Sequence, residues 1–259
     1  MNVPPLQIQI QMPSDRQPGP IPLRNAERSL ELLASIEASG SISRAAKQIR
    51  LSYKNAWDCV DAMNNLSQAP LIDYSAEGGT HLTEYGRRLL EAWHQLQETP
   101  PSAEPMEAVE IQRQLRALSL RTSARNQYRG RITRIERDAI EGCVTLDIGE
   151  GVTLQATLSG DSLEEMQLHE GSMAMALIKA DFVMLSPDPE VRISARNRLH
   201  GKLLSLIPGV VRSEVKLRLS PGRTLTALVT NASVAELELG TGQDCTALIK
   251  ASHVIIAVD

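Results

Sequence analysis

The sequence predicts an α+β protein of several domains, with a mainly helical N-terminal part followed by two small all-β barrels in tandem. Apolar residues recur at helical spacing from Arg24 to about Gln97, and short alternating runs typical of strands follow after Leu120. The strand-rich half matches itself, without gaps, at a separation of 71 residues. A length of 259 residues also suits several small cores better than one.

Proline-rich stretches and the repeat divide the chain. Prolines near the start predict a flexible arm, and "TPPSAEPM" predicts a hinge before a short helix. Each repeat has about five short strands, which suits a barrel of the oligonucleotide/oligosaccharide-binding (OB) type. We expect an arm at 1–23, a helical domain at 24–98, a linker and helix at 99–120, and barrels at 121–188 and 192–259.

Composition excludes several classes of protein. No apolar run approaches the roughly 18 residues that a membrane span needs, so we expect no membrane partner and a cytoplasmic location. Cys59, Cys143 and Cys245 are too scattered for a disulfide framework or a zinc site, and the five histidines are isolated. We therefore expect no coordinated metal cation. The net charge of −4 means that any surface for nucleic acid must be local.

The stretch "GSISRAAKQIRLSYKNAWDCVDAMNNL" (40–66) predicts two helices joined by a tight turn, as in a helix-turn-helix. Ser43 is expected to cap the first helix and Ser52 the second. "PLIDYSAEGGTHLTEYGRRLL" then predicts a hairpin with its tip at Gly78-Gly79, followed by a helix. Together these elements predict a winged helix-turn-helix.

The predicted helix-turn-helix has a basic face, with no acidic residue from Ser41 to Trp57. Side chains at the start of a second helix are those that reach base edges and phosphates. The residues expected to contact DNA are Arg44, Lys47, Arg50, Ser52, Tyr53, Lys54 and Asn55. The alternative is an ordinary helical hairpin with a basic solvated face. The wing, "SAEGGTH", carries no lysine or arginine.

The polar residues that both repeats retain form a donor set without an acid. They are Ser123/Ser194, Arg125/Arg196, Asn126/Asn197, Ser159/Thr230, Ser162/Ser233 and Lys179/Lys250. Two cations with several hydroxyls and an amide complement a small dianion with several acceptor oxygens. An isolated copy would be explained by ordinary turn and strand-end chemistry. A duplicated fold does not require exposed charges, so their retention in both copies favours an anion site.

Other functions are less consistent with these residues. "GDSL" at 160–163 imitates a hydrolase motif, but Ser162 has no apparent activating base, and we expect no enzyme and no catalytic residue. Barrels that bind single-stranded nucleic acid stack bases on aromatic residues. Beyond residue 110 the only aromatic residues are Tyr128 and Phe182, which argues against this function.

The SARN opening, the hydroxyl pair and "LIKA" resemble the Mop domain, a molybdate-binding unit, and "GSIS", "AWD" and "LTEYGRRL" resemble the N-terminal domain of the ModE family of molybdate-responsive transcriptional regulators. The resemblance implies molybdate as ligand, with tungstate as a mimic, and a homodimer that binds an inverted-repeat DNA operator and represses molybdate-uptake genes. A storage or buffering protein, whose N-terminal domain only dimerises, is the alternative.

The resemblance also implies two sets of molybdate ligands, to which the two retained asparagines are added. One set is Ser123, Arg125, Asn126, Ser159, Ser162, Lys179 and the backbone of Ala180. The other is Ser194, Arg196, Asn197, Thr230, Ser233, Lys250 and Ala251.

Overall fold

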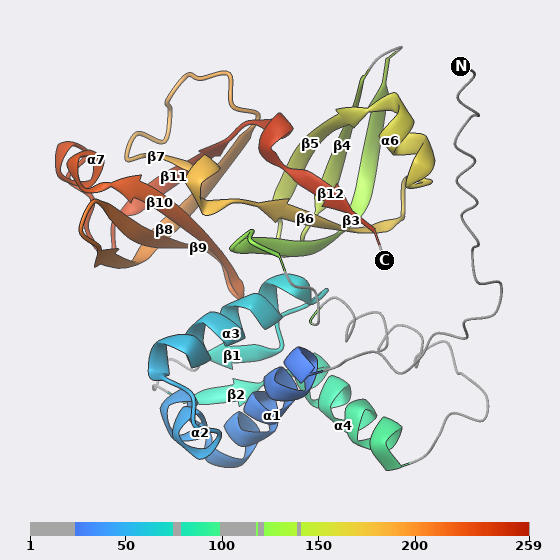
Figure 1. Ribbon diagram of the computed structural model, residues 1–259, viewed down its shortest axis with the longest axis vertical. Helices are drawn as coiled ribbons and strands as arrows, with labels where there is room; N and C mark the ends of the chain where they lie inside the picture. The colour runs from blue at the N-terminus through green and yellow to red at the C-terminus, as the bar shows by residue number, and fades with distance from the viewer. Residues whose placement is uncertain (1–23, 75–78, 99–117, 119–121, 139–140, 259) are drawn as a thin grey trace, which may run out of the picture.

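The computed structural model describes residues 24–74, 79–98, 118, 122–138 and 141–258. It confirms the α+β class: a helical N-terminal part lies against a strand-rich C-terminal part (Figure 1). The expected arm at 1–23, the linker and helix at 99–120 apart from Leu118, and the wing tip at Gly78 fall outside the described residues.

The N-terminal part contains four helices and a two-stranded hairpin among the described residues. They are α1 (Arg24–Ser39), α2 (Ile42–Gln48), α3 (Tyr53–Leu66), β1 (Ile72–Tyr74), β2 (Thr80–Leu82) and α4 (Glu84–Glu98). The small alanines at 45, 46 and 56 are buried with Leu33 and Val60, which lets α1, α2 and α3 pack closely. β1 and β2 pair antiparallel, as predicted for the wing.

Caps set the boundaries of the helix-turn-helix. α1 ends before Gly40, whose φ of +63° is readily adopted only without a side chain. The cap of α2 is Ser41, which accepts from the backbone N–H of Arg44, so the prediction of Ser43 was wrong by two residues. Ser41 has the extended backbone that a cap requires, whereas Ser43 is already helical. Ser52 caps α3 as predicted, accepting from Asn55 N at 3.1 Å.

The C-terminal part consists of two five-stranded antiparallel sheets. The first unit supplies β3 (Asn126–Arg137), β4 (Glu141–Asp147), β5 (Thr153–Ser159), α6 (Gly160–Glu165), β6 (Met173–Ile178), the 3₁₀ turn η1 (Ala180–Phe182) and β7 (Met184–Ser186). The second unit supplies β8 (Asn197–Pro208), β9 (Arg212–Ser220), β10 (Arg223–Thr230), α7 (Asn231–Glu236), β11 (Asp244–Ile249), η2 (Ala251–His253) and β12 (Ile255–Ala257).

The two units exchange their last strands. β12 of the second unit pairs with β6 of the first, giving the order β12-β6-β3-β4-β5. β7 of the first unit pairs with β11 of the second, giving the order β10-β9-β8-β11-β7. One hydrophobic core runs through both sheets. The sequence repeat therefore does not coincide with closed structural units, because each barrel takes its last strand from the other repeat.

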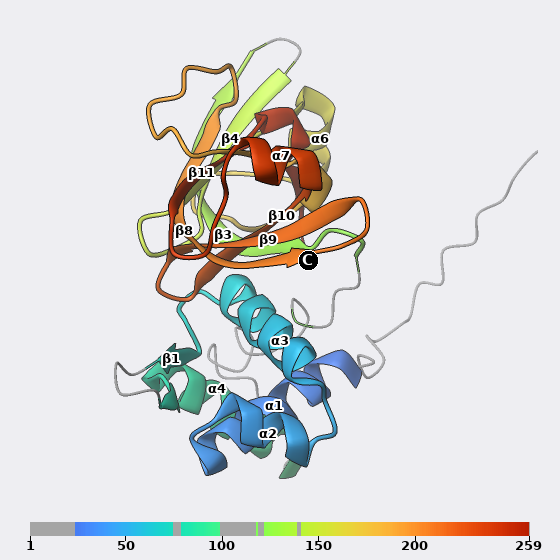
Figure 2. The same ribbon diagram turned by 90° about the vertical axis from the view of Figure 1, so that its left-hand side faces the viewer.

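The helical part meets the β part through α3, which lies against β3 and β10. Figure 2 shows α3 beside the β9–β10 strands. The cluster of apolar residues around α1, α3 and α4 also contains Met175 and Ala257, from β6 and the exchanged β12. The second helix of the helix-turn-helix is therefore in contact with the strand-rich half.

Candidate functional site

The two retained asparagines join the units to each other. The side chain of Asn126 donates to Thr226 O at 2.8 Å and accepts from Thr226 N at 2.7 Å. Asn197 makes the equivalent pair with the backbone of Gln155, at 2.9 and 2.7 Å. Both asparagines are nearly fully buried. Their amide groups are thus committed to holding β10 and β5, which fixes the SARN turn of each unit against the other unit.

The retained cations lie at the surface near this contact. Arg125 and Arg196 are exposed and immediately precede β3 and β8, while Lys179 and Lys250 are exposed at the starts of η1 and η2. The retained serines of the two SARN turns are exposed as well. The alanine that follows each lysine is buried, so each turn is anchored while its cation remains accessible.

The hydroxyl residues are grouped in two matching pairs. Ser159 Oγ lies 2.9 Å from Ser162 Oγ and caps α6. Thr230 Oγ1 lies 2.8 Å from Ser233 Oγ and caps α7. The substitution of threonine for serine between the repeats therefore preserves the local geometry. Each pair offers hydroxyl groups at the exposed end of an edge strand.

Contacts between the two units place the lysine turn of each unit beside the strand that carries the hydroxyl pair of the other. η1 of the first unit contacts β10, the strand that ends at Thr230, and η2 of the second unit contacts β5, which ends at Ser159. Arg212, opposite Thr230, makes an ion pair with Asp181 of η1. Lys179 is thereby brought toward the hydroxyls of the second unit, a grouping different from the sets implied by the resemblance.

The residues expected to contact DNA are all exposed. They are Arg44, Lys47, Arg50, Ser52, Tyr53, Lys54 and Asn55. No described residue forms an ion pair with the cations of α2 and the turn after it. Lys54 differs, because its Nζ lies 2.9 Å from Asp58 and 3.2 Å from Glu214 of β9. The hydrogen bond to Asp58 and the contact with Glu214 raise the pKa of Lys54 despite some burial.

Charged residues of β9 and α3 form a second cluster at the contact between the two halves. Lys216 Nζ lies 2.7 Å from both Asp58 and Asp61. Burial tends to lower the pKa of Lys216, but the two carboxylates outweigh it and the pKa is raised. Burial raises the pKa of Asp61, while hydrogen bonds from Lys216 and Lys54 overcome burial at Asp58 and lower its pKa.

Arg223 connects the same two halves, and no described acid forms an ion pair with it. It is fully buried and donates to backbone carbonyl oxygens of Ile148 at 2.6 Å, Ser67 at 2.9 Å and Asn64. Asn65 adds a bond to Thr224 O at 2.9 Å. This contact was not predicted from the sequence. A signal was present, because the first repeat has valine at the position of Arg223.

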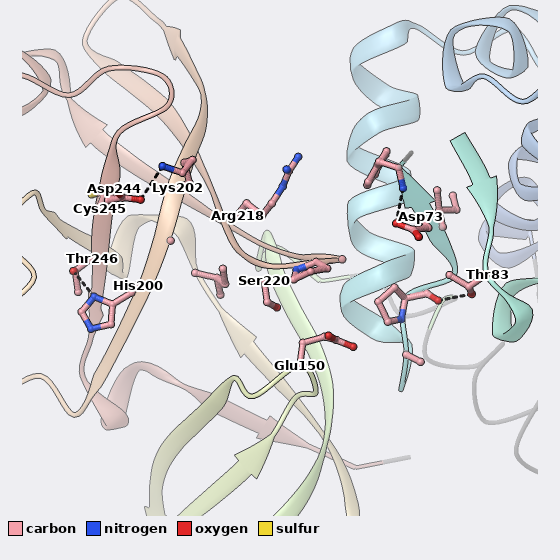
Figure 3. A pocket seen from close by; sticks show the side chains of 18 of the residues that line it. Asp73, Thr83, Glu150, His200, Lys202, Arg218, Ser220, Asp244, Cys245 and Thr246 are labelled. Carbon is pink, nitrogen blue, oxygen red and sulfur yellow. Dashed lines mark hydrogen bonds and ion pairs between the residues drawn. The ribbon is translucent and has the colours of Figure 1, made fainter. Parts of the chain in front are cut away.

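A cavity of about 1080 Å³ also lies between the halves (Figure 3). It is lined by β1 and the start of α4 on one side and by β8, β9 and β11 on the other. Its polar side chains include both signs of charge, and Lys202 is paired with Asp244 at 3.0 Å. None of the retained anion-site residues lines it.

Neither hydrolysis nor metal chemistry is supported by the described residues. The Oγ of Ser162 bonds to Ser159, and the ring of His169 bonds to the carbonyl of Glu170 at 3.0 Å. No group of three or more His, Cys, Asp or Glu side chains that could hold a metal ion occurs in the described part of the chain. Its helices include none that is long and apolar enough to cross a bilayer.

Comparison with known proteins relates both halves to characterised families. Residues 122–185 and 193–256 each match the TOBE domain, and residues 28–87 match the helix-turn-helix of bacterial regulatory proteins of the lysR family. The molybdate-bound structure of the cytoplasmic molybdate-binding protein ModG is 37% identical, with a TM-score of 0.52 over 54% of this chain and 100% of its own.

Full-length relatives share both halves. The molybdenum transport protein ModE of Azotobacter vinelandii is 37% identical, over 90% of this chain and 92% of its own. The DNA-binding transcriptional dual regulator ModE of Escherichia coli (strain K12) is 35% identical, over 89% and 92%. The molybdenum-pterin-binding protein MopB of Rhodobacter capsulatus is 42% identical, over 90% and 89%. With a helix-turn-helix, two TOBE domains and this identity along most of its length, the chain belongs to the ModE family.

Proposed function

We propose that the protein is a molybdate-responsive transcriptional regulator that represses molybdate-uptake genes when the oxyanion is bound. The observation that supports the proposal is the contact of η1 with β10 and of η2 with β5, which would group retained cations of one unit with the hydroxyl pair of the other. The relatives are named as regulators and binding proteins, in agreement with the expectation of no enzymatic activity.

The donor sets fit a tetrahedral oxyanion. The proposed first site takes Ser123, Arg125, Lys179 and Ala180 from the first unit and Thr230 and Ser233 from the second. The proposed second site takes Ser194, Arg196, Lys250 and Ala251 from the second unit and Ser159 and Ser162 from the first. Asn126 and Asn197 position these turns rather than contact the ligand.

Molybdate fits this chemistry because arginine, lysine and hydroxyls are all donors, and its charge of about −2 needs compensation by cations. Tungstate, with the same charge and nearly the same size, is expected to bind as a mimic. Because each site uses both units, a bound oxyanion would hold the units together and stabilise one arrangement of the strand-rich half.

DNA binding is assigned to the exposed basic face of α2 and the start of α3. A two-fold symmetric homodimer would match an inverted-repeat operator, with one recognition helix in each half-site. A regulator of this kind works in the cytoplasm, where bacterial DNA lies. Thermodynamic linkage then requires that operator DNA tighten molybdate binding by the same factor by which molybdate tightens DNA binding.

Calorimetric titration with sodium molybdate, repeated in excess sulfate, tests the ligand. Heat that persists in sulfate is expected, and its absence would remove the molybdate assignment. A DNA fragment selected from a random-sequence library then tests regulation, with and without molybdate. The double variant Arg44→Ala/Lys47→Ala should lose DNA affinity and keep molybdate binding. Molybdate binding without selective DNA binding under either condition would point to storage instead.

A further inference from the structure

Glu214 lies between a proposed oxyanion ligand and the helix expected to read DNA. One of its carboxylate oxygens is paired with Arg125, and the other lies 3.2 Å from Lys54 Nζ on α3. The Glu214 side chain is 15% exposed, whereas Arg125 and Lys54 are about half exposed. The carboxylate is thus held at the contact, and the two cations share it.

The second repeat differs from the first at this position. Cys143 occupies the place of Glu214 on β4, so the first repeat has a neutral side chain where the second has a carboxylate. Burial and Glu136 raise the pKa of the Cys143 thiol, and the charge of Arg196 lowers it. Among the described residues, no carboxylate is paired with Arg196. The arginine of the second site is therefore free of the competitor that holds Arg125.

Other acidic residues near the two proposed sites do not compensate for the difference between Arg125 and Arg196. Near the first site Asp181 is already paired with Arg212. In the second, Glu141 occupies the position equivalent to Arg212 and lies opposite Ser159, but it forms no ion pair with a described cation. The second site also has Asp161, which lies between Ser159 and Ser162 at the start of α6, is exposed and pairs with no described cation. Among the described residues, only the first site therefore has a carboxylate paired with the retained arginine itself.

We propose that Glu214 makes the two oxyanion sites unequal and couples the first of them to α3. The inference rests on the proposed molybdate function. An oxyanion at Arg125 must displace the Glu214 carboxylate, which costs affinity, so the second site fills first and the first site fills at higher concentration.

The displaced carboxylate remains beside Lys54. Without Arg125 as a partner, it interacts with Lys54 alone, which strengthens the contact between β9 and α3. The reverse also holds: the Lys54 cation draws Glu214 away from Arg125 and adds positive charge near the oxyanion. Filling of the first site thus fastens α3 to the second unit, and docking of α3 raises the affinity of that site.

Titration of the full chain with sodium molybdate tests the inequality. The wild type should show a tighter and a weaker class of site. Glu214→Gln and Glu214→Cys, the latter restoring the residue of the first repeat, should tighten the weaker class about fivefold and leave the other unchanged. Cys143→Glu is the reciprocal variant and should weaken the tighter class. Lys54→Met should weaken the weaker class further.

Hydrogen exchange provides a readout of the coupling. At saturating molybdate, α3 amides should gain protection in the wild type and not in Glu214→Gln, with circular dichroism confirming that both are folded. The proposal would be overturned if the wild type bound molybdate at sites of equal affinity. It would also be overturned if neither Glu214→Gln nor Glu214→Cys changed the affinity of the weaker class. A wild type that gives no heat with molybdate would instead overturn the function on which it rests.

Discussion

Arg223 of the second unit occupies the position that Val152 occupies in the first, and only the arginine reaches the helical domain. The substitution converts a strand end into an anchor, because the guanidinium satisfies backbone carbonyls after α3 and at Ile148. The two β9 residues that meet α3, Glu214 and Lys216, likewise differ from their first-repeat counterparts. The charged contacts with α3 are thus a property of the second repeat, although β3 of the first repeat also lies against this helix.

Replacing Arg223 by methionine should destabilise the contact between the halves. Several buried carbonyl oxygens would lose a charged donor, and we expect a loss of about 3 kcal/mol in unfolding free energy. Urea denaturation measures it. Arg218→Met on the neighbouring strand is the control, because Arg218 is exposed and should cost less than about 0.5 kcal/mol. Equal effects of the two variants would mean that Arg223 is not an anchor.

The asparagines that bridge the units give a chemical test of their hydrogen bonds. Asn126→Ala removes one donor and one acceptor from a buried backbone pair and should cost about 2 kcal/mol. Asn126→Asp keeps the acceptor for Thr226 N but loses the donor, and places a buried carboxylate next to a carbonyl. Thermal unfolding should therefore rank the aspartate variant at or below alanine. An aspartate variant as stable as wild type would contradict the hydrogen bonds described.

Strand exchange predicts that a destabilising substitution in the last strand of one unit loosens the sheet of the other unit. Ile256 of β12 lies opposite Ala176, and its counterpart Leu185 of β7 lies opposite Ala247. Ile256→Ala should increase hydrogen exchange in β6 of the first unit, and Leu185→Ala should do so in β11 of the second. Each variant is the control for the other. Increases confined to the unit that contains the substitution would show that the strands are not exchanged.

Gly86 of α4 is a helical glycine that should not tolerate alanine. Alanine ordinarily stabilises a helix interior by about 1 kcal/mol relative to glycine. At this position a Cβ would lie 2.2 Å from the carbonyl oxygen of Leu71, so α4 would have to move from the wing. We expect a net loss of about 2 kcal/mol in thermal or urea unfolding. Glu91→Ala, on the exposed face of α4, should be nearly neutral, and a stabilised Gly86→Ala would refute the close approach.

Lys216 predicts weakening of the contact between the halves at high pH. The carboxylates of Asp58 and Asp61 raise its pKa above the ordinary 10.5 in the folded protein, despite burial. Its contribution is therefore fully present below about pH 10.5 and is lost as the pH rises through the raised value. The difference in melting temperature between wild type and Lys216→Met should shrink above about pH 10.5. A difference independent of pH would exclude an ionic role.

Much of the fold could be predicted from the sequence because its signals are local or duplicated. The spacing of Leu30, Leu33 and Ile36 indicated the apolar face of α1, and the cap at Ser52 marked α3. The cap of α2 was misplaced because "GSIS" offers two serines at alternate positions, and only backbone conformation distinguishes them. The retained cations and hydroxyls could be identified because the two copies serve as an internal comparison.

The relationships between units could not be predicted in the same way. Strand exchange leaves the repeat pattern unchanged, because β7 and β12 have the same apolar character whichever sheet they join. The assignment of Thr230 and Ser233 to the site of Arg125 depends on which unit faces which. The asparagines were predicted as ligands because an amide suits an oxyanion, although their bonds are made to Thr226 and Gln155.

The exchanged strands also constrain how the protein is made. β12, which completes the sheet of the first unit, follows the whole of the second unit in the sequence. Domains commonly fold one after another as they leave the ribosome. Here the first unit cannot complete its sheet until the second has been translated, and until then the edge of β6 stays unpaired. The two β units should therefore complete their folding together, in a single late step. A ribosome stalled between the repeats would expose an incomplete sheet to chaperones and to other nascent chains.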